Sequence, residues 1–343
     1  MATTSSSGTE FSEGLNAGFE TDGEALPPGL GPWRLAWRRL RRNHVALFFG
    51  GVFVLILVMC ALAPVYANDV AHIGPNTGNI TGTVKVGGHE ENIVSLTGIP
   101  IGPTWTSHYF FGADGNGRDT AVRVLYGGRN SLEIGFIATI ITMVLAMIVG
   151  IIAGYHRGIA DGLISRGMDI IWAYPAVLLG VTLGTVLAVG GLGPIHGDNL
   201  FVPAFVIGIV YIPYVGKPVR AQVLQMRERE FIDAARQQGL SHTRIMFSEI
   251  LPNLASTIIV FIPLILANAI LLEAALSYLG VGVQPPNPSW GNMISDGIST
   301  IPEAFQNVLV PGIMLVLCVM SINIFGDGLR DALDPRAKVR IAH

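Results

Sequence analysis

The sequence predicts an all-α integral membrane protein with six transmembrane helices. Three observations predict this fold class: a low share of charged residues, six long segments without any charge, and a one-sided distribution of arginine and lysine. Of the 343 residues, 50% are hydrophobic and only 13% are charged, whereas soluble domains carry about 25% charged residues. Since a soluble core needs a charged surface over it, this composition argues against a water-soluble enzyme and excludes disorder over most of the chain.

Six segments are long and apolar enough to cross a bilayer, whose hydrocarbon core of about 30 Å needs about 20 helical residues. None of the six contains Lys, Arg, Asp or Glu. The fourth is the shortest and contains two prolines, whose freed backbone groups neighbouring helices would have to satisfy. The segments are Val45–Ala67, Ile134–Tyr155, Ile170–Gly193, Leu200–Gly216, Leu254–Leu272 and Phe305–Gly326.

The distribution of basic residues predicts the orientation of these spans. Of the 21 Lys and Arg residues, 17 lie before the first span, after the second, after the fourth or after the sixth. Because basic residues accumulate in cytoplasmic loops, both termini are expected to face the cytoplasm. The first span is expected to be retained, since it is longer than the core of a signal peptide and 44 residues precede it.

The segments outside the spans have distinct compositions. A polar start predicts disorder, and a basic stretch with interleaved Trp and Leu predicts an amphipathic helix on the anionic leaflet, although its arginines could equally only set the topology. The predicted division is a disordered cytoplasmic tail (1–30), a basic interfacial helix (31–44), the first span (45–67), an extracytoplasmic loop (68–130), a core with the other five spans (131–336) and a cytoplasmic tail (337–343).

No catalytic or nucleotide-binding pattern is present in the sequence. Gly216 and Lys217 are followed by Pro218, so they do not form a phosphate-binding loop. The eight histidines are scattered without metal-binding spacing, and both cysteines, Cys60 and Cys318, lie inside apolar runs. A net charge of −3 gives no basic excess for nucleic acid. The sequence therefore predicts a protein that is not an enzyme.

The cytoplasmic loop of residues 217–253 is the most informative segment. Apolar residues at Val223, Met226, Ile232 and Ala235 predict an amphipathic helix, which Gly239 can end by adopting a positive φ. Ser241 could cap a second short helix before Pro252 leads into the fifth span. Because this helix–turn–helix is acidic in part and anchored between two spans, it suits a protein partner better than DNA.

This loop resembles the EAA loop of permease subunits of ABC importers, whose pattern is E-A-A-x-x-x-G followed by I-x-L-P. Asp233 stands in place of the pattern's glutamate, and Glu249 stands where the pattern has isoleucine. The resemblance implies that the loop couples to an ATPase subunit. The implied coupling residues are Glu230, Asp233, Ala234, Ala235, Gly239, Leu251 and Pro252.

Other segments resemble the C-type permease subunits of the dipeptide/oligopeptide family, which also includes nickel permeases. Residues 111–119 (FGADGNGRD) and 126–132 (YGGRNSL) look like its F-G-T-D-x-x-G-R-D and Y-G-x-R-x-S-L signature, with Ala113 in place of threonine. The outer loop of residues 68–107 looks longer than is usual in the family. The matching signature residues are Gly112, Asp114, Gly117, Arg118, Asp119, Glu273, Gly326 and Asp327.

The resemblance implies a type I ABC importer permease fold in a prokaryotic cell membrane. The implied partners are a second permease subunit forming a heterodimer, two cytoplasmic ATPase subunits, an extracytoplasmic substrate-binding protein, a peptide substrate and membrane lipid. This chain would bind no cofactor, because ATP and Mg²⁺ would sit on the ATPase subunits. A nickel or other small-solute permease remains an alternative.

An ion-coupled secondary transporter is a further alternative, but it would usually carry a buried carboxylate within a span. The six segments contain none. Glu273, which follows the fifth span, is expected either to face the translocation path or to lie at the membrane interface. Arg118 and Asp119 are expected to pair and shape the outer loop, rather than to contact a binding protein. The pairs Gly150/Gly154 and Gly180/Gly184 allow close helix approach, most simply within one subunit.

Overall fold

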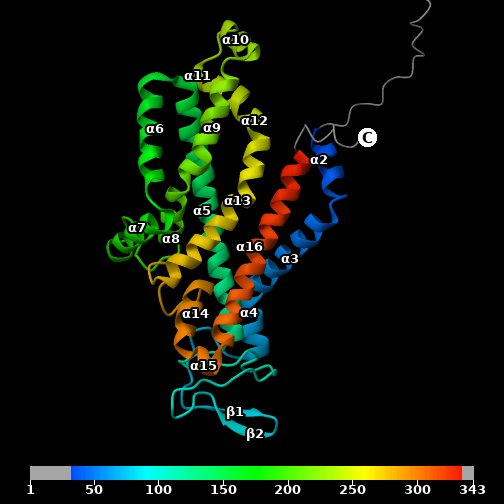
Figure 1. Cartoon of the computed structure of the whole chain (residues 1–343), viewed down its shortest axis with the longest axis vertical. Coiled ribbons are helices and arrows are strands. Elements are labelled where there is room, and N and C mark those ends of the chain that lie inside the picture. Colours follow the sequence, from blue (N-terminus) through cyan, green and yellow to red (C-terminus); the bar gives the residue numbers. More distant parts are fainter. Residues whose placement is uncertain (1–31, 334–343) are drawn as a thin grey trace, which may run out of the picture.

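The computed structural model describes residues 32–333, and these residues are mostly helical. The predicted tails of residues 1–30 and 337–343 lie outside them. Among the described residues, four helices are long and apolar enough to cross a membrane, and two bent helix pairs raise the possible number of spans to six. The molecule is elongated, with a helical loop at one end and a β-hairpin at the other (Figure 1). We call these the loop end and the hairpin end. The four long helices are α3 (His44–Ala61), α5 (Thr120–His156), α13 (Ala255–Tyr278) and α16 (Gln306–Leu333).

The N-terminal part packs against the C-terminal helix. Helix α2 (Pro32–Leu40) falls in the predicted interfacial segment, and Leu40 packs with Ala46 of α3 and Ala332 of α16. The side chain of Asn43 caps α3 by accepting a hydrogen bond from the Ala46 N–H at 3.0 Å. The regular helix ends at Ala61 rather than at the predicted Ala67, and is followed by short turns, α4 (Ala63–Val65) and η1 (Tyr66–Ala71).

The segment after the first span carries the only strands among the described residues. Strands β1 (Thr83–Val86) and β2 (His89–Asn92) pair antiparallel, with Gly87 and Gly88 at positive φ in the turn. The outer loop is shorter than the predicted range of 68–130, because α5 already begins at Thr120. The start of α5 is fixed by Asp119, whose carboxylate accepts hydrogen bonds from two N–H groups in the first turn of the helix, as an N-cap residue does.

The third and fourth predicted spans are bent helix pairs rather than single straight helices. The third predicted span, Ile170–Gly193, covers only the end of α6 (Gly158–Ala173) together with α7 (Ala176–Gly190), and the two helices meet at 96°. Its predicted start is therefore wrong, because α6 begins twelve residues earlier. Pro175 causes the break, since it has no N–H and holds the preceding Tyr174 in extended backbone.

The fourth pair, α8 (Phe201–Val210) and α9 (Ile212–Met226), bends by 42° beside Pro213. Helix α9 continues well past the predicted end of the span at Gly216. The first part of the loop that was expected to begin at residue 217 is therefore a continuation of this helix.

The loop between the fourth and fifth spans contains α10 (Glu230–Gln237), α11 (His242–Ile245), η2 (Met246–Ile250) and α12 (Leu251–Asn253). Helix α13 follows and extends six residues beyond the predicted limit of Leu272. At the hairpin end, α14 (Trp290–Gly297), η3 (Ile298–Thr300) and α15 (Ile301–Ala304) lead into α16.

The long helices approach one another closely where the sequence has small residues. A Cβ atom on Gly150 would lie 2.7 Å from Val219, and one on Gly154 would lie 2.7 Å from Val223, so these glycines let α5 and α9 touch. Gly180 and Gly184 of α7 face Leu276 and Val281 in the same way. Both glycine pairs thus pack within one subunit, as predicted.

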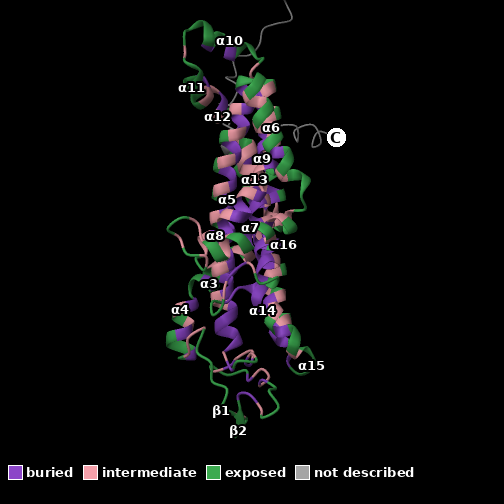
Figure 2. Cartoon of the chain, turned by 90° about the vertical axis from the view of Figure 1, so that its left-hand side faces the viewer, coloured by how far each residue is buried: buried purple, intermediate pink, exposed green. Residues whose placement is uncertain are grey.

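Cys60 and Cys318 are buried in the core, also as predicted. Buried residues run through the centre of the bundle, whereas both ends are largely exposed (Figure 2).

Candidate functional site: the helical loop at one end of the bundle

The helical loop, residues 227–253, forms the tip of the molecule beyond the long helices (Figure 1). Its two helices are separated as the sequence predicts: Gly239 follows α10 with a φ of +79°, and the Ser241 side chain accepts a hydrogen bond from the N–H of Arg244 to cap α11. The predicted turn at Gly239 and the cap at Ser241 are confirmed, but the predicted first helix is wrong as a single element. Val223 and Met226 belong to α9, which ends at Met226, whereas Ile232 and Ala235 belong to α10, which begins at Glu230.

Helix α10 has one buried face and one exposed face. Ile232 and Ala235 are buried, whereas Glu230, Asp233 and Ala234 are exposed. The two neighbouring alanines thus differ, and only Ala234 lies on the surface where a partner could approach closely. Asp233 forms an ion pair with Arg236 one turn further along the helix, at 3.1 Å.

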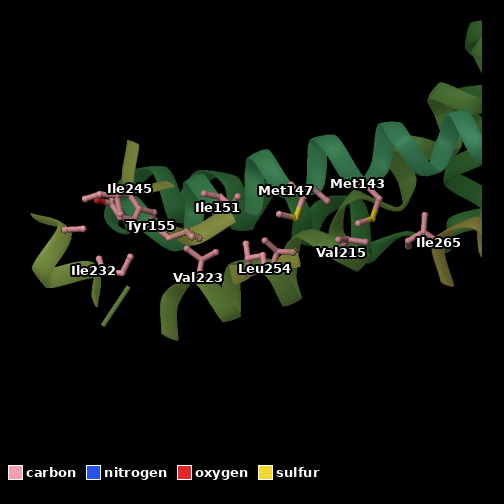
Figure 3. Packing of buried hydrophobic residues seen from close by; sticks show 14 residues of the cluster. Met143, Met147, Ile151, Tyr155, Val215, Val223, Ile232, Ile245, Leu254 and Ile265 are labelled. Carbon is pink, nitrogen blue, oxygen red and sulfur yellow. The ribbon is translucent and has the colours of Figure 1, made fainter. Parts of the chain in front are cut away.

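The buried face of α10 belongs to a continuous apolar cluster that extends deep into the helix bundle. Ile232 and Ala235 pack with Ile245 of α11 and with the ends of α5 and α9, and the cluster continues to Ile265 of α13 (Figure 3). Protein interiors are packed like organic crystals and transmit displacement rather than absorbing it. The loop is therefore joined mechanically to α5, α9 and α13.

Tyr155, at the end of α5, contacts the loop through several polar interactions. Its hydroxyl forms a hydrogen bond with Nδ1 of His242 at 2.9 Å, and its backbone carbonyl accepts one from the Arg227 guanidinium at 2.6 Å. Arg227 and Arg236 both lie over its ring, each 5.9 Å from the centroid. Since its side chain is also buried in the apolar cluster, Tyr155 joins α5 to three parts of the loop.

Two ion pairs brace the corner beside Tyr155. Arg157, which follows α5, pairs with Glu228, and Arg220 of α9 pairs with Asp161 of α6. Arg157 has a φ of +55°, a backbone region that only glycine adopts freely. The corner between α5 and α6 is thus held to the start of the loop.

The last two predicted coupling residues lie where the loop returns to the bundle. Leu251 packs against the apolar cluster, whereas Pro252 is exposed at the start of α12. Glu249, which replaces the isoleucine of the family pattern, accepts a hydrogen bond from the Ser248 hydroxyl. Ile250, one residue later, is fully buried and fills the apolar position.

The signature residues of the outer segment lie at the hairpin end. Arg118 pairs with Asp114 at 2.6 Å and with Asp296 of α14 at 3.5 Å, so the predicted pairing with Asp119 is wrong. The carboxylate of Asp119 instead accepts hydrogen bonds from the N–H groups of Tyr109, Ala121 and Val122, at 2.6, 2.8 and 3.1 Å. Burial raises the pKa of the Asp119 carboxyl, and these three hydrogen bonds oppose that rise.

Two signature glycines make close backbone contacts possible in the same segment. Gly112 and Gly117 have φ values of +84° and +68°, and a Cβ atom on either would lie about 2.5–2.6 Å from a neighbouring carbonyl oxygen. Only glycine combines this conformation with this closeness. These residues therefore shape the outer segment.

Glu273 lies in neither of the two predicted places. Helix α13 extends past it, and the side chain is fully buried inside the subunit, where the Ser277 hydroxyl donates a hydrogen bond to Oε1 at 2.6 Å. Its Oε2 has no hydrogen-bond partner among the described residues. The expectation that no carboxylate lies within a span is therefore wrong for α13. Gly326 allows α16 to approach Pro263 of α13, and Asp327 is exposed.

Sequence reasoning missed three residues of the loop end. Hydropathy marks Tyr155 only as the last residue of an apolar span, although an aromatic hydroxyl at a helix end is suited to join buried and polar groups. Phe231 and Phe247 are exposed, the latter by 66%, beside the charged residues of the loop. An aromatic side chain within a polar loop was the signal that could have marked them, since exposed aromatic residues are enriched at protein interfaces.

Comparison with known proteins places the chain in a family. Residues 146–339 match the family described as "Binding-protein-dependent transport system inner membrane component", and residues 31–78 match the "N-terminal TM domain of oligopeptide transport permease C". A dipeptide transport system permease protein of Alkalihalophilus pseudofirmus is 36% identical, over 90% of this chain and 91% of that protein. A glutathione transport system permease protein of Pectobacterium atrosepticum is 34% identical, over 90% and 92%.

A solved structure shares the fold. The methionine ABC transporter MetNI in inward-facing conformations superimposes with a TM-score of 0.50 at 17% identity, over 62% of this chain and 96% of the matched chain. The predicted type I ABC importer permease fold is confirmed by the family match and this neighbour. The chain therefore belongs to the family of inner membrane components of binding-protein-dependent transport systems and is a multi-pass protein of the inner membrane.

Proposed function

We propose that this chain is one permease subunit of an ATP-driven importer for peptides, and that the exposed face of α10 docks onto an ATPase subunit. The observation that carries the proposal is the continuous apolar cluster that joins α10 and α11 to α5, α9 and α13 (Figure 3). Relatives named as dipeptide, glutathione and peptide transport permeases support a peptide as the cargo.

In this proposal the loop end faces the cytoplasm, where two ATPase subunits bind ATP and Mg²⁺. The docking surface consists of the exposed residues of α10 and the neighbouring aromatic side chains of Phe231 and Phe247. Charged residues around small and aromatic ones are typical of a protein interface. Asp233 would provide the acidic group that the family pattern places here.

Movement of the ATPase subunits would displace α10 as a rigid body. Ile232 and Ala235 are locked into the cluster, so the displacement would pass to α9 through Val223 and to α5 through Tyr155. Packed interfaces of this kind shift between discrete arrangements rather than deforming continuously. The spans would thereby open the path alternately to the two sides of the membrane.

The hairpin end would face the substrate-binding protein outside the cytoplasmic membrane. A second permease subunit would complete the translocation path as a heterodimer partner, with the path along the seam between the two chains. Exposed apolar side chains along α6 and α7, such as Ile159, Leu163 and Val189, offer a surface to that subunit or to lipid.

Reconstitution in lipid vesicles tests this function. The complete transporter should accumulate labelled dialanine only under two conditions. ATP must be present on the side of the membrane where the ATPase subunits bind, and the substrate-binding protein must be present on the other side. Dissipating proton and sodium gradients should leave this uptake unchanged. Uptake by this chain alone, driven by an ion gradient without ATP, would show that it is a secondary transporter instead.

A further inference from the structure

A polar cavity of about 390 Å³ opens at the hairpin end. One of its walls includes residues of α14, which lies far from α10 of the helical loop (Figure 1). Its walls come from the turn at residues 114–118, the first turn of α5, the segment from α14 to η3 and the start of α16. Two arginines, Arg118 and Arg123, and two aspartates, Asp114 and Asp296, line it. The proposed transport function so far assigns no role to this cavity.

One of the two arginines is fixed in place by the protein. Arg123 is only 2% exposed, and its Nη1 donates hydrogen bonds to the backbone carbonyls of Pro75 at 3.0 Å and Pro286 at 3.4 Å. Its Nε lies 3.4 Å from Asp114. Because Nη1 donates only to neutral oxygens and Asp114 is shared with Arg118, the positive charge of Arg123 remains partly uncompensated at the wall of the cavity.

The other arginine has one firm partner and one weak partner. The Nε of Arg118 donates a hydrogen bond to Oδ2 of Asp114 at 2.6 Å. Oδ1 of Asp114 accepts hydrogen bonds from the backbone N–H groups of Asn116 and Arg118, each at 2.9 Å. Asp114 is therefore built into the turn. Asp296 is 57% exposed and lies 3.5 Å from Nη2 of Arg118. An exposed ion pair of this length contributes little, so Asp296 is the carboxylate that a ligand could replace.

We propose that this cavity receives a carboxylate from outside the chain, which takes the place of Asp296 on the Arg118 guanidinium. The planar fork of arginine matches a carboxylate with two hydrogen bonds, and Arg123 adds a second positive charge. The Ser295 hydroxyl on the cavity wall has no hydrogen-bond partner among the described residues and can donate a further bond. The cavity wall therefore offers the positive charge of two arginines and a hydroxyl donor to an anion that accepts hydrogen bonds.

The carboxylate has two possible sources that share this chemistry. It is either the C-terminal carboxylate of a free peptide or an acidic side chain of the substrate-binding protein. The second source rests on the proposed function, since only an importer of this kind has such a partner. The two sources are distinguished by measuring the binding of a free peptide and the binding of the substrate-binding protein in separate experiments.

The test uses two variants with opposite expected effects. Arg118→Gln removes the charged fork and should weaken binding by about tenfold or more, as loss of a charge-assisted hydrogen bond does. Asp296→Asn removes the internal competitor and should strengthen binding about twofold to fivefold, the range of an exposed ion pair. Arg129→Gln and Glu303→Gln change exposed charges elsewhere on α5 and α15 and should leave binding unchanged.

Binding is measured in two ways. Calorimetry on the purified chain in detergent compares dialanine with dialanine amide, which lacks the carboxylate. In the complete transporter in nanodiscs, the concentration of substrate-binding protein that gives half-maximal ATPase stimulation is determined. Opposite shifts of the two variants in the first measurement identify a free peptide, and opposite shifts in the second identify an acidic side chain of the partner.

Shifts in the same direction, or no shift in either measurement, would overturn the proposal. Because Arg118 also holds the turn, Arg118→Lys serves as a second variant that keeps the charge and loses the fork, with an intermediate loss expected. If neither Arg118 variant folds, Asp296→Asn alone decides: stronger binding supports the cavity site and unchanged or weaker binding refutes it.

Failure of this inference can be distinguished from failure of the transport function. Wild-type uptake that needs ATP, together with variants whose binding does not shift, contradicts only this inference. An absence of ATP-driven uptake contradicts the transport function, while dialanine calorimetry still tests the cavity.

Discussion

The two ends of the molecule are stabilised by different kinds of interaction. At the loop end, a short helix rests on an apolar cluster that runs into the bundle, and polar contacts of Tyr155 and Arg157 lie at the edge of that cluster. At the hairpin end, an irregular segment is held by buried polar groups, above all Asp119, Arg123 and Asn307. Apolar packing suits a part that moves as one body, because the hydrophobic effect is not directional. Hydrogen bonds suit a part whose backbone has to keep one irregular shape.

The largest expected effect comes from removing the side chain that joins α5 to the loop. Tyr155→Ala should lower the free energy of unfolding by about 3–5 kcal/mol, since it leaves a cavity and removes the bond to His242. It should also uncouple ATP hydrolysis from uptake. Tyr155→Phe keeps the packing and should cost only about 1 kcal/mol. Unfolding in mixed micelles measures both variants; equal losses would mean that packing at this position matters less than the hydroxyl.

At the hairpin end, the corresponding substitution is Asp119→Ala. It leaves three N–H groups without their acceptor and should cost about 2–3 kcal/mol. Asp119→Asn keeps one acceptor oxygen for the first turn of α5 and should lose less. Thermal unfolding of the purified chain compares the two variants. A loss from alanine no greater than that from asparagine would contradict the capping role.

A third substitution tests the contact between α5 and α9. A Cβ atom on Gly154 would lie 2.7 Å from Val223 and 2.8 Å from the carbonyl oxygen of Arg220, so Gly154→Ala should cost about 1–3 kcal/mol. The control is Gly167→Ala in α6, where a Cβ atom meets nothing within 4 Å. That variant should be neutral or stabilising by up to about 1 kcal/mol. If both variants unfold alike, close packing of α5 and α9 is not what holds this region.

The smallest effect on stability is expected at the exposed face of α10. Asp233→Asn breaks an exposed ion pair with Arg236 and should change the free energy of unfolding by no more than about 0.5 kcal/mol. ATP-driven uptake should nevertheless fall, because the proposed docking surface loses its acidic group. Uptake and thermal unfolding measured on the same preparation separate the two effects. Unchanged uptake would remove Asp233 from the docking surface.

The sequence was a good guide wherever a local rule decides the structure. Gly239 and Ser241 end and start helices through their own backbone preference and hydrogen bonding, so both could be recognised in the sequence. The glycine pairs of α5 and α7 were likewise recognisable from their spacing. Hydropathy locates the apolar segments, but it predicts neither the ends of their helices nor the break at Pro175 inside the third predicted span.

The errors arise where distant segments decide the structure. Hydropathy ended the fourth span at Gly216, although α9 continues because Val219 and Val223 pack on the glycines of α5. Arg118 was assigned to its neighbour Asp119, but the fold brings it to Asp114 and Asp296. Glu273 is predicted at the translocation path or at the membrane interface but is buried, because spacing along one helix does not show which other helices cover its end. Partners of this kind depend on tertiary contacts that no local pattern records.

The most direct test of the central claim concerns a single exposed residue. Ala234→Glu places a bulky charge on the outer face of α10 without touching the buried cluster beneath it. The chain should keep its thermal stability but lose copurification with the ATPase subunits and ATP-driven uptake. Ser107→Glu, at an exposed position of the hairpin end, should keep copurification with the ATPase subunits. Full copurification and uptake by Ala234→Glu would contradict the account that α10 is the docking helix.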